Sequence, residues 1–354
     1  MQALAQTIDQ TQGKGDENGV EKKVTKITSE MTLGDLKSIP ELGEVADLML
    51  INCPAITDDI SLGRLGMDPP YDTGSLVLGM QYLLDRGREG HRLNLPLYSP
   101  QQLKEDPDRA RAAMTFFQGD TGAPYIILCS GGGYQLLTNL SEGFPTAARL
   151  SQLGFNVFVV TYRVGSADVI SRATEDIAAA VRYVEENADL LGVESGRYIV
   201  SGFSAGGHLA ALWGTEEHGF ARFGLPAPTA VFLSYAAASM RILLESRDEI
   251  CQRMLTVVMG ENFGEEEIDR YSMEELIDKD YPSTFLWHCR DDESVPFRTA
   301  KMLAQTLERY GVPYEFMAVD HGGHGRGLAL NSEAEGWTER ATAFWKTRCS
   351  KSTQ

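Results

Sequence analysis

The chain has 354 residues, enough for one large α/β domain with extensions or for two ordinary domains. Hydrophobic residues make up 43% of it, and no apolar run approaches the roughly 20 residues that a membrane span requires, which indicates a soluble globular protein. The formal net charge of −18 argues against nucleic acid or a membrane surface as a partner, because both are anionic, and favours a small-molecule substrate of low charge.

The N-terminus and the cysteines indicate a reducing compartment. The stretch MQALAQTIDQTQGKGDENGVEKK lacks the charged and then apolar pattern of a secretory signal, so we expect a cytoplasmic protein. The five cysteines are scattered without CxxC spacing, which argues against both a disulfide framework and a zinc site. We therefore expect free thiols and no bound metal.

Composition divides the chain into parts. Residues 1–30 are polar, Gly-rich and without periodicity, which predicts a flexible N-terminal segment. In residues 31–90, short apolar-periodic stretches are broken by prolines, and we expect a helical accessory region. From 91 to 354, strand-like runs alternate with amphipathic helices, which predicts an α/β domain with a mostly parallel sheet and helices on both faces.

The predicted strands are continuous apolar runs rather than alternating ones, as expected of strands covered on both faces. They are residues 93–98, 125–129, 156–162, 198–202, 230–236, 284–288 and 314–319. Thr174 is a candidate N-cap of a helix with Glu175 and Asp176 in its first turn. Further helices are expected over 297–310, ended by Gly311, and over 333–346. The segment 239–280 separates two strands and is a candidate cap insertion.

The stretch Gly202-Phe203-Ser204-Ala205-Gly206 matches G-x-S-x-G and lies between a predicted strand and a helix. Glycines permit a turn too sharp for side chains, and such a turn would hold Ser204 in a strained conformation at the carboxyl edge of the sheet. The pattern alone also fits a small residue in a tight turn. A serine nucleophile needs a histidine to take its proton and a carboxylate to orient that histidine.

Candidate partners follow the last two predicted strands. Asp291 and Asp292 come just after the first of these strands, and His321 and His324 come just after the second. The chain order Ser, Asp, His, with every group after a strand of one parallel sheet, predicts a catalytic triad at one edge. The order itself leaves the choice within each pair open.

A glycine-rich loop supplies a candidate oxyanion hole. The run CSGGGYQ directly follows the strand 125–129, so the backbone N–H groups of Gly132 and Gly133, with that of Ala205, could stabilise a tetrahedral intermediate. The run lacks the Lys-Ser/Thr of a P-loop and the G-x-G-x-x-G spacing of a dinucleotide site, and no cofactor is expected. Tyr134 and Phe203 are possible substrate-binding residues, although each fits core packing equally well.

Several motifs together resemble a known family. They are SGGGY at 130–134, TYR at 161–163, GFSAGGHLA at 202–210, DDESVP at 291–296 and HGGHGRGLA at 321–329. Residues 93–347 thereby resemble the α/β-hydrolase superfamily, in its acetyl-esterase and acetylxylan-esterase-like branch related to hormone-sensitive-lipase-type esterases. The family pattern D-x-x-V-P matches Asp292, and its H-G ahead of small and apolar residues matches His324. Ser130 stands where many relatives have His or Pro, so the support of the loop is expected to differ.

The resemblance implies a serine carboxylesterase with Ser204, His324 and Asp292 as its triad. It further implies a short acyl group, an acetyl group on a plant-derived oligosaccharide, and no metal or organic cofactor. A peptidase or an arylformamidase would use the same triad. A binding protein that keeps the hydrolase fold without catalysis is the alternative from a different class.

Overall fold

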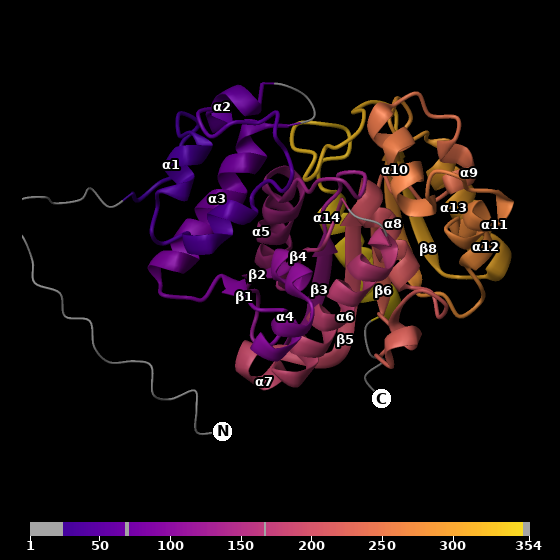
Figure 1. Ribbon diagram of the computed structural model, residues 1–354, viewed down its shortest axis with the longest axis horizontal. Coiled ribbons are helices and arrows are strands. Elements are labelled where there is room, and N and C mark those ends of the chain that lie inside the picture. Colours follow the sequence, from indigo (N-terminus) through magenta and orange to yellow (C-terminus); the bar gives the residue numbers. More distant parts are fainter. Residues whose placement is uncertain (1–23, 68–70, 166–167, 350–354) are drawn as a thin grey trace, which may run out of the picture.

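The computed structural model describes residues 24–67, 71–165 and 168–349. Its centre is an eight-stranded sheet in the order β1-β2-β4-β3-β5-β6-β7-β8 (Figure 1). Strand β2 pairs antiparallel with β1 and β4, and all strands from β4 across to β8 are parallel. The strands are β1 Asn94–Leu95, β2 Ala113–Phe117, β3 Ala123–Cys129, β4 Asn156–Thr161, β5 Val193–Phe203, β6 Ala230–Ser234, β7 Ser283–Cys289 and β8 Tyr314–Val319.

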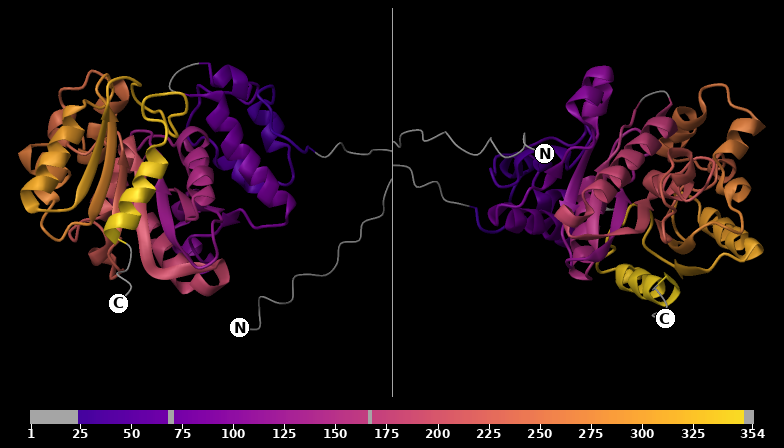
Figure 2. Two further views of the ribbon diagram at one scale, coloured as in Figure 1. Left: turned by 180° about the vertical axis from the view of Figure 1, so that it is seen from behind. Right: turned by 90° about the horizontal axis from the view of Figure 1, so that it is seen from below.

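Helices cover both faces of this sheet (Figure 2). The α-helices are α1 Leu33–Lys37, α2 Leu62–Leu65, α3 Thr73–Arg88, α4 Pro100–Glu105, α5 Phe144–Gln152, α6 Val169–Glu186, α7 Ala188–Leu191, α8 Ser204–Trp213, α9 Met240–Leu243, α10 Glu249–Met259, α11 Glu265–Arg270, α12 Met273–Leu276, α13 Arg298–Tyr310 and α14 Trp337–Cys349. Short 3₁₀ helices span Gly43–Leu48, Pro107–Arg111 and Phe220–Phe223, and a π-helical turn spans Asn139–Gly143. The architecture confirms the predicted α/β class with a mostly parallel sheet.

Two hydrophobic cores lie on opposite faces of the sheet. Along β3, Ile127 points into one core, whereas Ile126 and Leu128 point into the other. The first core contains the apolar sides of α6, α8 and α13, and the second contains those of α3, α5 and α14. Because both faces are buried, the strands read as continuous apolar runs.

The accessory helices pack on the second face, and Figure 1 shows α1 to α3 together on one side of the molecule. Helix α3 approaches α5 so closely that a Cβ on Gly79 would lie 2.8 Å from the backbone nitrogen of Pro145. The predicted flexible segment needs a correction in residues 24–30, because Ile27 is 1% exposed and its N–H donates to Gln81 Oε1 at 2.8 Å. Residues 1–23 of that segment lie outside the described residues, and the division of the chain near residue 90 stays a prediction.

The predicted strands miss one strand of the sheet and overstate the length of another. Strand β2 was not predicted. The expected strand 93–98 is only Asn94–Leu95, because Pro96 has no N–H with which to continue the ladder. The predicted strands on the parallel side of the sheet all form, and their ends differ by a few residues.

The predicted cap of α6 was also wrong. This helix begins at Val169, so Thr174 lies inside it and donates its hydroxyl to the carbonyl of Ile170. Asp176 is buried rather than exposed in a first turn, and it is bonded to Arg163. By contrast, α13 ends as predicted, with Gly311 at a φ of 71°.

No helix in the described ranges is both long enough and apolar enough to cross a membrane.

Candidate active site

Ser204 lies in a sharp turn between β5 and α8. Its φ is 52°, in the left-handed region that non-glycine residues rarely adopt, as the motif predicted. The flanking glycines are required by close backbone contacts: a Cβ on Gly202 would lie 2.1 Å from the oxygen of Gly206, and one on Gly206 would lie 2.3 Å from the oxygen of Ser130. The turn therefore presents the serine hydroxyl at the carboxyl edge of the sheet and at the N-terminus of a helix.

The structure brings one histidine and one aspartate to Ser204. The Nε2 atom of His324, after β8, is 2.9 Å from Ser204 Oγ, and its Nδ1 atom is 2.8 Å from Asp292 Oδ2, after β7. Since the carboxylate can only accept, Nδ1 carries the hydrogen and Nε2 accepts from the serine. The other oxygen of Asp292 accepts from the N–H groups of Ser294 and Val295, which explains the D-x-x-V spacing.

Burial and electrostatic attraction shift the pKa values of Asp292 and His324 in opposite directions. Burial raises the pKa of Asp292, but the attraction of His324 and His288 outweighs it and holds the pKa well below its ordinary value. Burial lowers the pKa of His324, but the charge and hydrogen bond of Asp292 outweigh it, so that this pKa is raised. The carboxylate is therefore ionised, and its charge favours the imidazolium form of His324 over what burial alone would allow.

A second histidine contacts the same carboxylate. His288 is fully buried, and its Nε2 atom lies 3.0 Å from Asp292 Oδ2 and 2.9 Å from the carbonyl oxygen of Val295. Sequence reasoning assigned His288 no role, because it lies inside a strand and matches no motif. Its only signal is its position four residues before Asp292.

The alternative pair lies apart from the serine. Asp291 accepts from the N–H groups of Gly322 and Gly323 and so holds the loop that carries both histidines. His321 is 3.6 Å from Asp291, and its side chain is 78% exposed. The structure thus brings Asp292 and His324 to Ser204, and neither Asp291 nor His321 contacts it.

The glycine loop after β3 faces the serine. The N–H groups of Gly132 and Gly133 donate to no acceptor in the described part of the chain, which leaves them free for a substrate oxygen. Ala205 presents its N–H from the first turn of α8, where helices have unpaired donors. The carbonyl of Ser130 accepts from the hydroxyl of Tyr162 at 2.8 Å, so a tyrosine supports the loop in this chain.

Two predicted substrate contacts were wrong. Tyr134 and Phe203 are fully buried, and neither lines the cavity over Ser204. The hydroxyl of Tyr134 lies 2.9 Å from Nδ1 of His208, and Phe203 packs against Tyr235. Both are core residues: the side chain of Tyr134 packs in the core on one face of the sheet, and that of Phe203 packs in the core on the other face. His208 is structural as predicted, and burial lowers its pKa to about 4.

A cavity of about 360 Å³ opens over Ser204 and His324. It is lined by the loop of residues 53–56, by Tyr71, Gly132, Gly133, Leu136, Thr138, Ser141, Glu142, Ile250, Ser294 and Gly325. The accessory region therefore builds one wall, and Ile250 of α10 brings the segment 239–280 to the same cavity. Burial raises the pKa of the Cys53 thiol to about 11, so this thiol is protonated at neutral pH and is a poor nucleophile.

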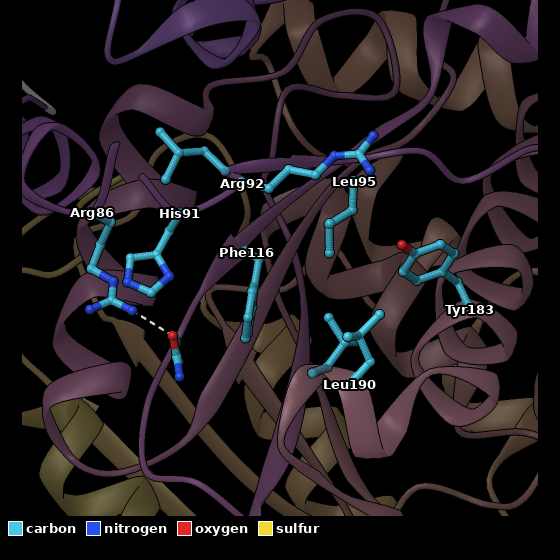
Figure 3. Close-up of a pocket in the computed structure, with 10 residues that line it drawn as sticks. Arg86, His91, Arg92, Leu95, Phe116, Tyr183 and Leu190 are labelled. Carbon is cyan, nitrogen blue, oxygen red and sulfur yellow. Dashed lines mark hydrogen bonds between the residues drawn. The ribbon is translucent and has the colours of Figure 1, made fainter. Parts of the chain in front are cut away.

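Another cavity, of about 400 Å³, lies beside β1 and β2. Figure 3 shows Phe116, Leu95 and Tyr183 around it, with the cationic side chains of Arg86 and Arg92 at its edge. None of the predicted site residues contributes to its lining. The predicted chemistry is therefore confined to the cavity over Ser204.

This fold and this edge of the sheet define an α/β-hydrolase. The BD-FAE family model matches residues 117–307, more than half of the chain, and the protein belongs to the BD-FAE family. The match falls within the esterase branch that the sequence motifs resemble.

Relatives of known name agree with this family. Endo-1,4-beta-xylanase B of Butyrivibrio fibrisolvens is 26% identical over 222 residues, which cover 60% of this chain and 34% of that protein. Acetylxylan esterase of Xylanibacter ruminicola is 31% identical over 109 residues, 30% of this chain and 22% of that protein. The chain thus spans only about 34% and 22% of the length of these two relatives.

Solved structures support the same fold. The acetyl ester-xyloside bifunctional hydrolase of Caldicellulosiruptor lactoaceticus is 29% identical, with a TM-score of 0.61 over 72% of this chain and 95% of that one. The carboxylesterase Cest-2923 of Lactobacillus plantarum, at 21% identity and a TM-score of 0.57, covers 66% of this chain and 92% of its own and shows the fold alone.

Proposed function

We propose that the protein is a serine carboxylesterase that hydrolyses short-chain esters through a Ser204, His324 and Asp292 triad and an acyl-enzyme. The observation that carries this proposal is the continuous hydrogen-bonded chain from Ser204 Oγ to His324 Nε2 at 2.9 Å and from His324 Nδ1 to Asp292 Oδ2 at 2.8 Å, with Ser204 and His324 lining one cavity. A nucleophile, a base and a group that orients the base are the elements of acyl transfer.

The geometry supports the following steps. Ser204 Oγ attacks the ester carbonyl while its proton passes to Nε2 of His324, and the ionised Asp292 stabilises the imidazolium. The negative oxygen of the tetrahedral intermediate accepts from Gly132, Gly133 and Ala205. Nε2 then gives its proton to the departing alcohol oxygen. A water molecule, deprotonated by the same nitrogen, then attacks the acyl carbon; the bond between that carbon and Ser204 Oγ breaks, Nε2 returns the proton to Oγ, and the acid is released.

The cavity supports a short acyl group. Its lining includes the apolar residues Pro54, Ala55, Ile56, Leu136 and Ile250, and its volume of about 360 Å³ is near the lower end of the range for small-molecule sites, which favours a small ester group. The names of the xylanase, the acetylxylan esterase and the acetyl ester-xyloside hydrolase support an acetylated plant oligosaccharide as the substrate.

The deciding experiment measures acetate release from acetylated xylo-oligosaccharides, with p-nitrophenyl acetate as a second substrate. Wild type is compared with Ser204→Ala and with Ser201→Ala, a control near the end of β5 whose buried hydroxyl has no hydrogen-bond partner in the described part of the chain. We expect Ser201→Ala to match wild type and Ser204→Ala to lose activity on both substrates.

Each outcome has a distinct meaning. Turnover of the aryl ester alone would retain the triad and discard the sugar. Preferred turnover of formyl anilides or aminoacyl anilides would favour an arylformamidase or a peptidase. Ligand binding without any serine-dependent hydrolysis would favour a non-catalytic binding protein, and full activity in Ser204→Ala would refute the mechanism.

A further inference from the structure

We propose that Glu142 and Tyr235 form a positioning pair that locks the oxyanion loop to the histidine loop. The inference rests on the proposed esterase function and adds two residues that no motif pointed to. Neither is a catalytic residue, because hydrogen bonds within the protein occupy both carboxylate oxygens and the phenol hydroxyl. Their effect on the reaction would pass through the two loops that they hold.

Glu142 is a buried carboxylate beneath the oxyanion loop. It lies in the π-helical turn Asn139–Gly143 and is 3% exposed. Its Oε2 atom accepts from the N–H of Gly131 at 2.6 Å and from the hydroxyl of Thr138 at 2.9 Å, and its Oε1 atom accepts from the hydroxyl of Tyr235 at 2.8 Å. A buried charge is costly unless it is fully hydrogen-bonded, and here each oxygen has its donors.

The bond to Gly131 acts directly on the oxyanion donors. Gly131 immediately precedes Gly132, and a Cβ on Gly131 would lie 2.9 Å from Cβ of Ser204 and 3.0 Å from Oε2 of Glu142. The loop is thus held between the serine and the carboxylate. Fixing the Gly131 peptide fixes the start of the chain that presents the N–H groups of Gly132 and Gly133.

Tyr235 continues the connection to the histidine. It directly follows β6 and has a φ of 37°, a conformation that costs on the order of 1–3 kcal/mol for a residue other than glycine. Its hydroxyl donates to Glu142 and accepts from the N–H of Gly327, in the loop after His324, at 2.8 Å. Its ring meets the His324 ring edge to face, with centroids 4.8 Å apart. One side chain therefore contacts both the imidazole and its loop.

This arrangement predicts a specific kinetic effect. The oxyanion and the imidazolium develop in the transition state, so loosening the two loops relative to each other removes stabilisation that the bound ester does not experience. We expect kcat to fall while KM changes little. A role in stability alone would lower the unfolding temperature and leave kcat of the folded enzyme unchanged.

The test uses Tyr235→Phe and Glu142→Gln with p-nitrophenyl acetate. Tyr235→Phe keeps the ring and removes only the hydroxyl. Glu142→Gln replaces one carboxylate oxygen by an NH₂ group, which cannot accept the hydrogen bonds that this oxygen accepts in wild type. We expect kcat to fall about 10- to 100-fold in each, with KM within about twofold, because removing one oxyanion donor outright costs about 100- to 1,000-fold. If the pair acts as a unit, the double variant loses little more than Glu142→Gln alone.

The chain provides a matched control. Like Glu142, Glu185 accepts from a tyrosine hydroxyl, an aliphatic hydroxyl and a glycine N–H. Its donors are Tyr125 at 2.6 Å, Ser195 at 2.5 Å and Gly196 at 2.9 Å. Tyr125 lies toward the amino end of β3, whereas the oxyanion loop follows its carboxyl end. We expect Tyr125→Phe and Glu185→Gln to keep wild-type kcat even if they unfold at a lower temperature.

Two results would overturn the inference. One is a folded Tyr235→Phe enzyme whose kcat is within about twofold of wild type, and this variant decides the matter if Glu142→Gln does not fold. The other is a rise in KM at constant kcat. Failure of the proposed function itself would appear differently, as wild-type turnover that does not depend on Ser204.

Discussion

Replacing Asp292 by asparagine tests the proposed mechanism at a single atom. In the folded protein Oδ2 of Asp292 faces Nδ1 of His324 and Nε2 of His288, while Oδ1 accepts from the N–H groups of Ser294 and Val295. The asparagine oxygen would keep the two backbone donors, and its amide NH₂ would replace Oδ2. An amide donor beside Nδ1 requires that nitrogen to be the acceptor.

The consequence is the wrong tautomer of His324. The hydrogen moves to Nε2, which can then no longer accept the proton of Ser204 Oγ. We expect kcat to fall about 10⁴-fold, the size of effect seen when a triad aspartate is replaced in this way, which corresponds to about 5 kcal/mol in the barrier. The fold should persist, because asparagine is nearly isosteric with aspartate.

The pH profile supplies an independent readout. His324 must be neutral to act as a base, so activity falls as the pH falls through its pKa. Attraction to Asp292 raises that pKa against the effect of burial, and we expect the acid limb of wild-type kcat/KM to lie above the value of about 6.5 for an ordinary histidine. In Asp292→Asn the burial remains without the attraction, so the limb of the residual activity should move to lower pH.

The assay is p-nitrophenyl acetate hydrolysis from mildly acidic to mildly alkaline pH, with Asp291→Asn as the control. Asp291 is on the same loop but contacts neither Ser204 nor His324: it accepts from the N–H groups of Gly322 and Gly323 and lies 3.6 Å from His321, so its replacement should leave kcat much closer to wild type than Asp292→Asn does. Activity of Asp292→Asn within tenfold of wild type would refute the reasoning. Equal damage from Asp291→Asn would show that the structure assigns the wrong carboxylate.

Further predictions concern the pocket and stability. Ile56→Ala enlarges the cavity wall and should raise the preference for butyrate over acetate esters about 10-fold, measured as a ratio of kcat/KM values; an unchanged ratio would remove Ile56 from the acyl site. Folding lowers the pKa of Asp292, so its carboxylate stabilises the folded protein above the unfolded pKa of about 4, and this stabilisation is lost as the pH falls through the lower pKa of the folded state. The free energy of unfolding measured in urea should therefore fall more steeply with acid in wild type than in Asp292→Asn. Gly206→Ala should cost about 1–3 kcal/mol or more, since its Cβ would lie 2.3 Å from the oxygen of Ser130, whereas Gly264→Ala, with nothing nearer than 3.6 Å, should change stability by about 0.5 kcal/mol or less.

The sequence predicted the parts of the site that are coded locally. The elbow glycines and the D-x-x-V turn depend on neighbours a few residues away, whereas the order of the three polar groups was informative because each follows a strand of one parallel sheet, whose carboxyl ends share an edge. The choice of Asp292 over Asp291 came from the family pattern, and the turn shows its physical basis: the carboxylate accepts from the backbone two and three residues further on.

The parts that were missed depend on contacts between distant segments. Glu142 gives no periodic signal, and its partner Tyr235 is 93 residues away. The cap predicted at Thr174 failed because Asp176 forms a buried ion pair with Arg163, which makes an acidic stretch part of the helix interior. Tyr134 and Phe203 were misassigned because a side chain beside a turn can point either way, and only packing decides its direction.

The cavity wall formed by residues 53–56 comes from a different part of the chain than the residues proposed to react with the ester. The groups proposed to cleave the ester follow the ends of β3, β5, β7 and β8, whereas this wall comes from a loop that belongs to none of those strands. Substitutions in the loop can therefore change which acid and alcohol fit, while the strained serine turn and its hydrogen bonds remain undisturbed. New ester preferences are accessible to this scaffold, by natural variation or by directed evolution, at little risk to its catalytic machinery.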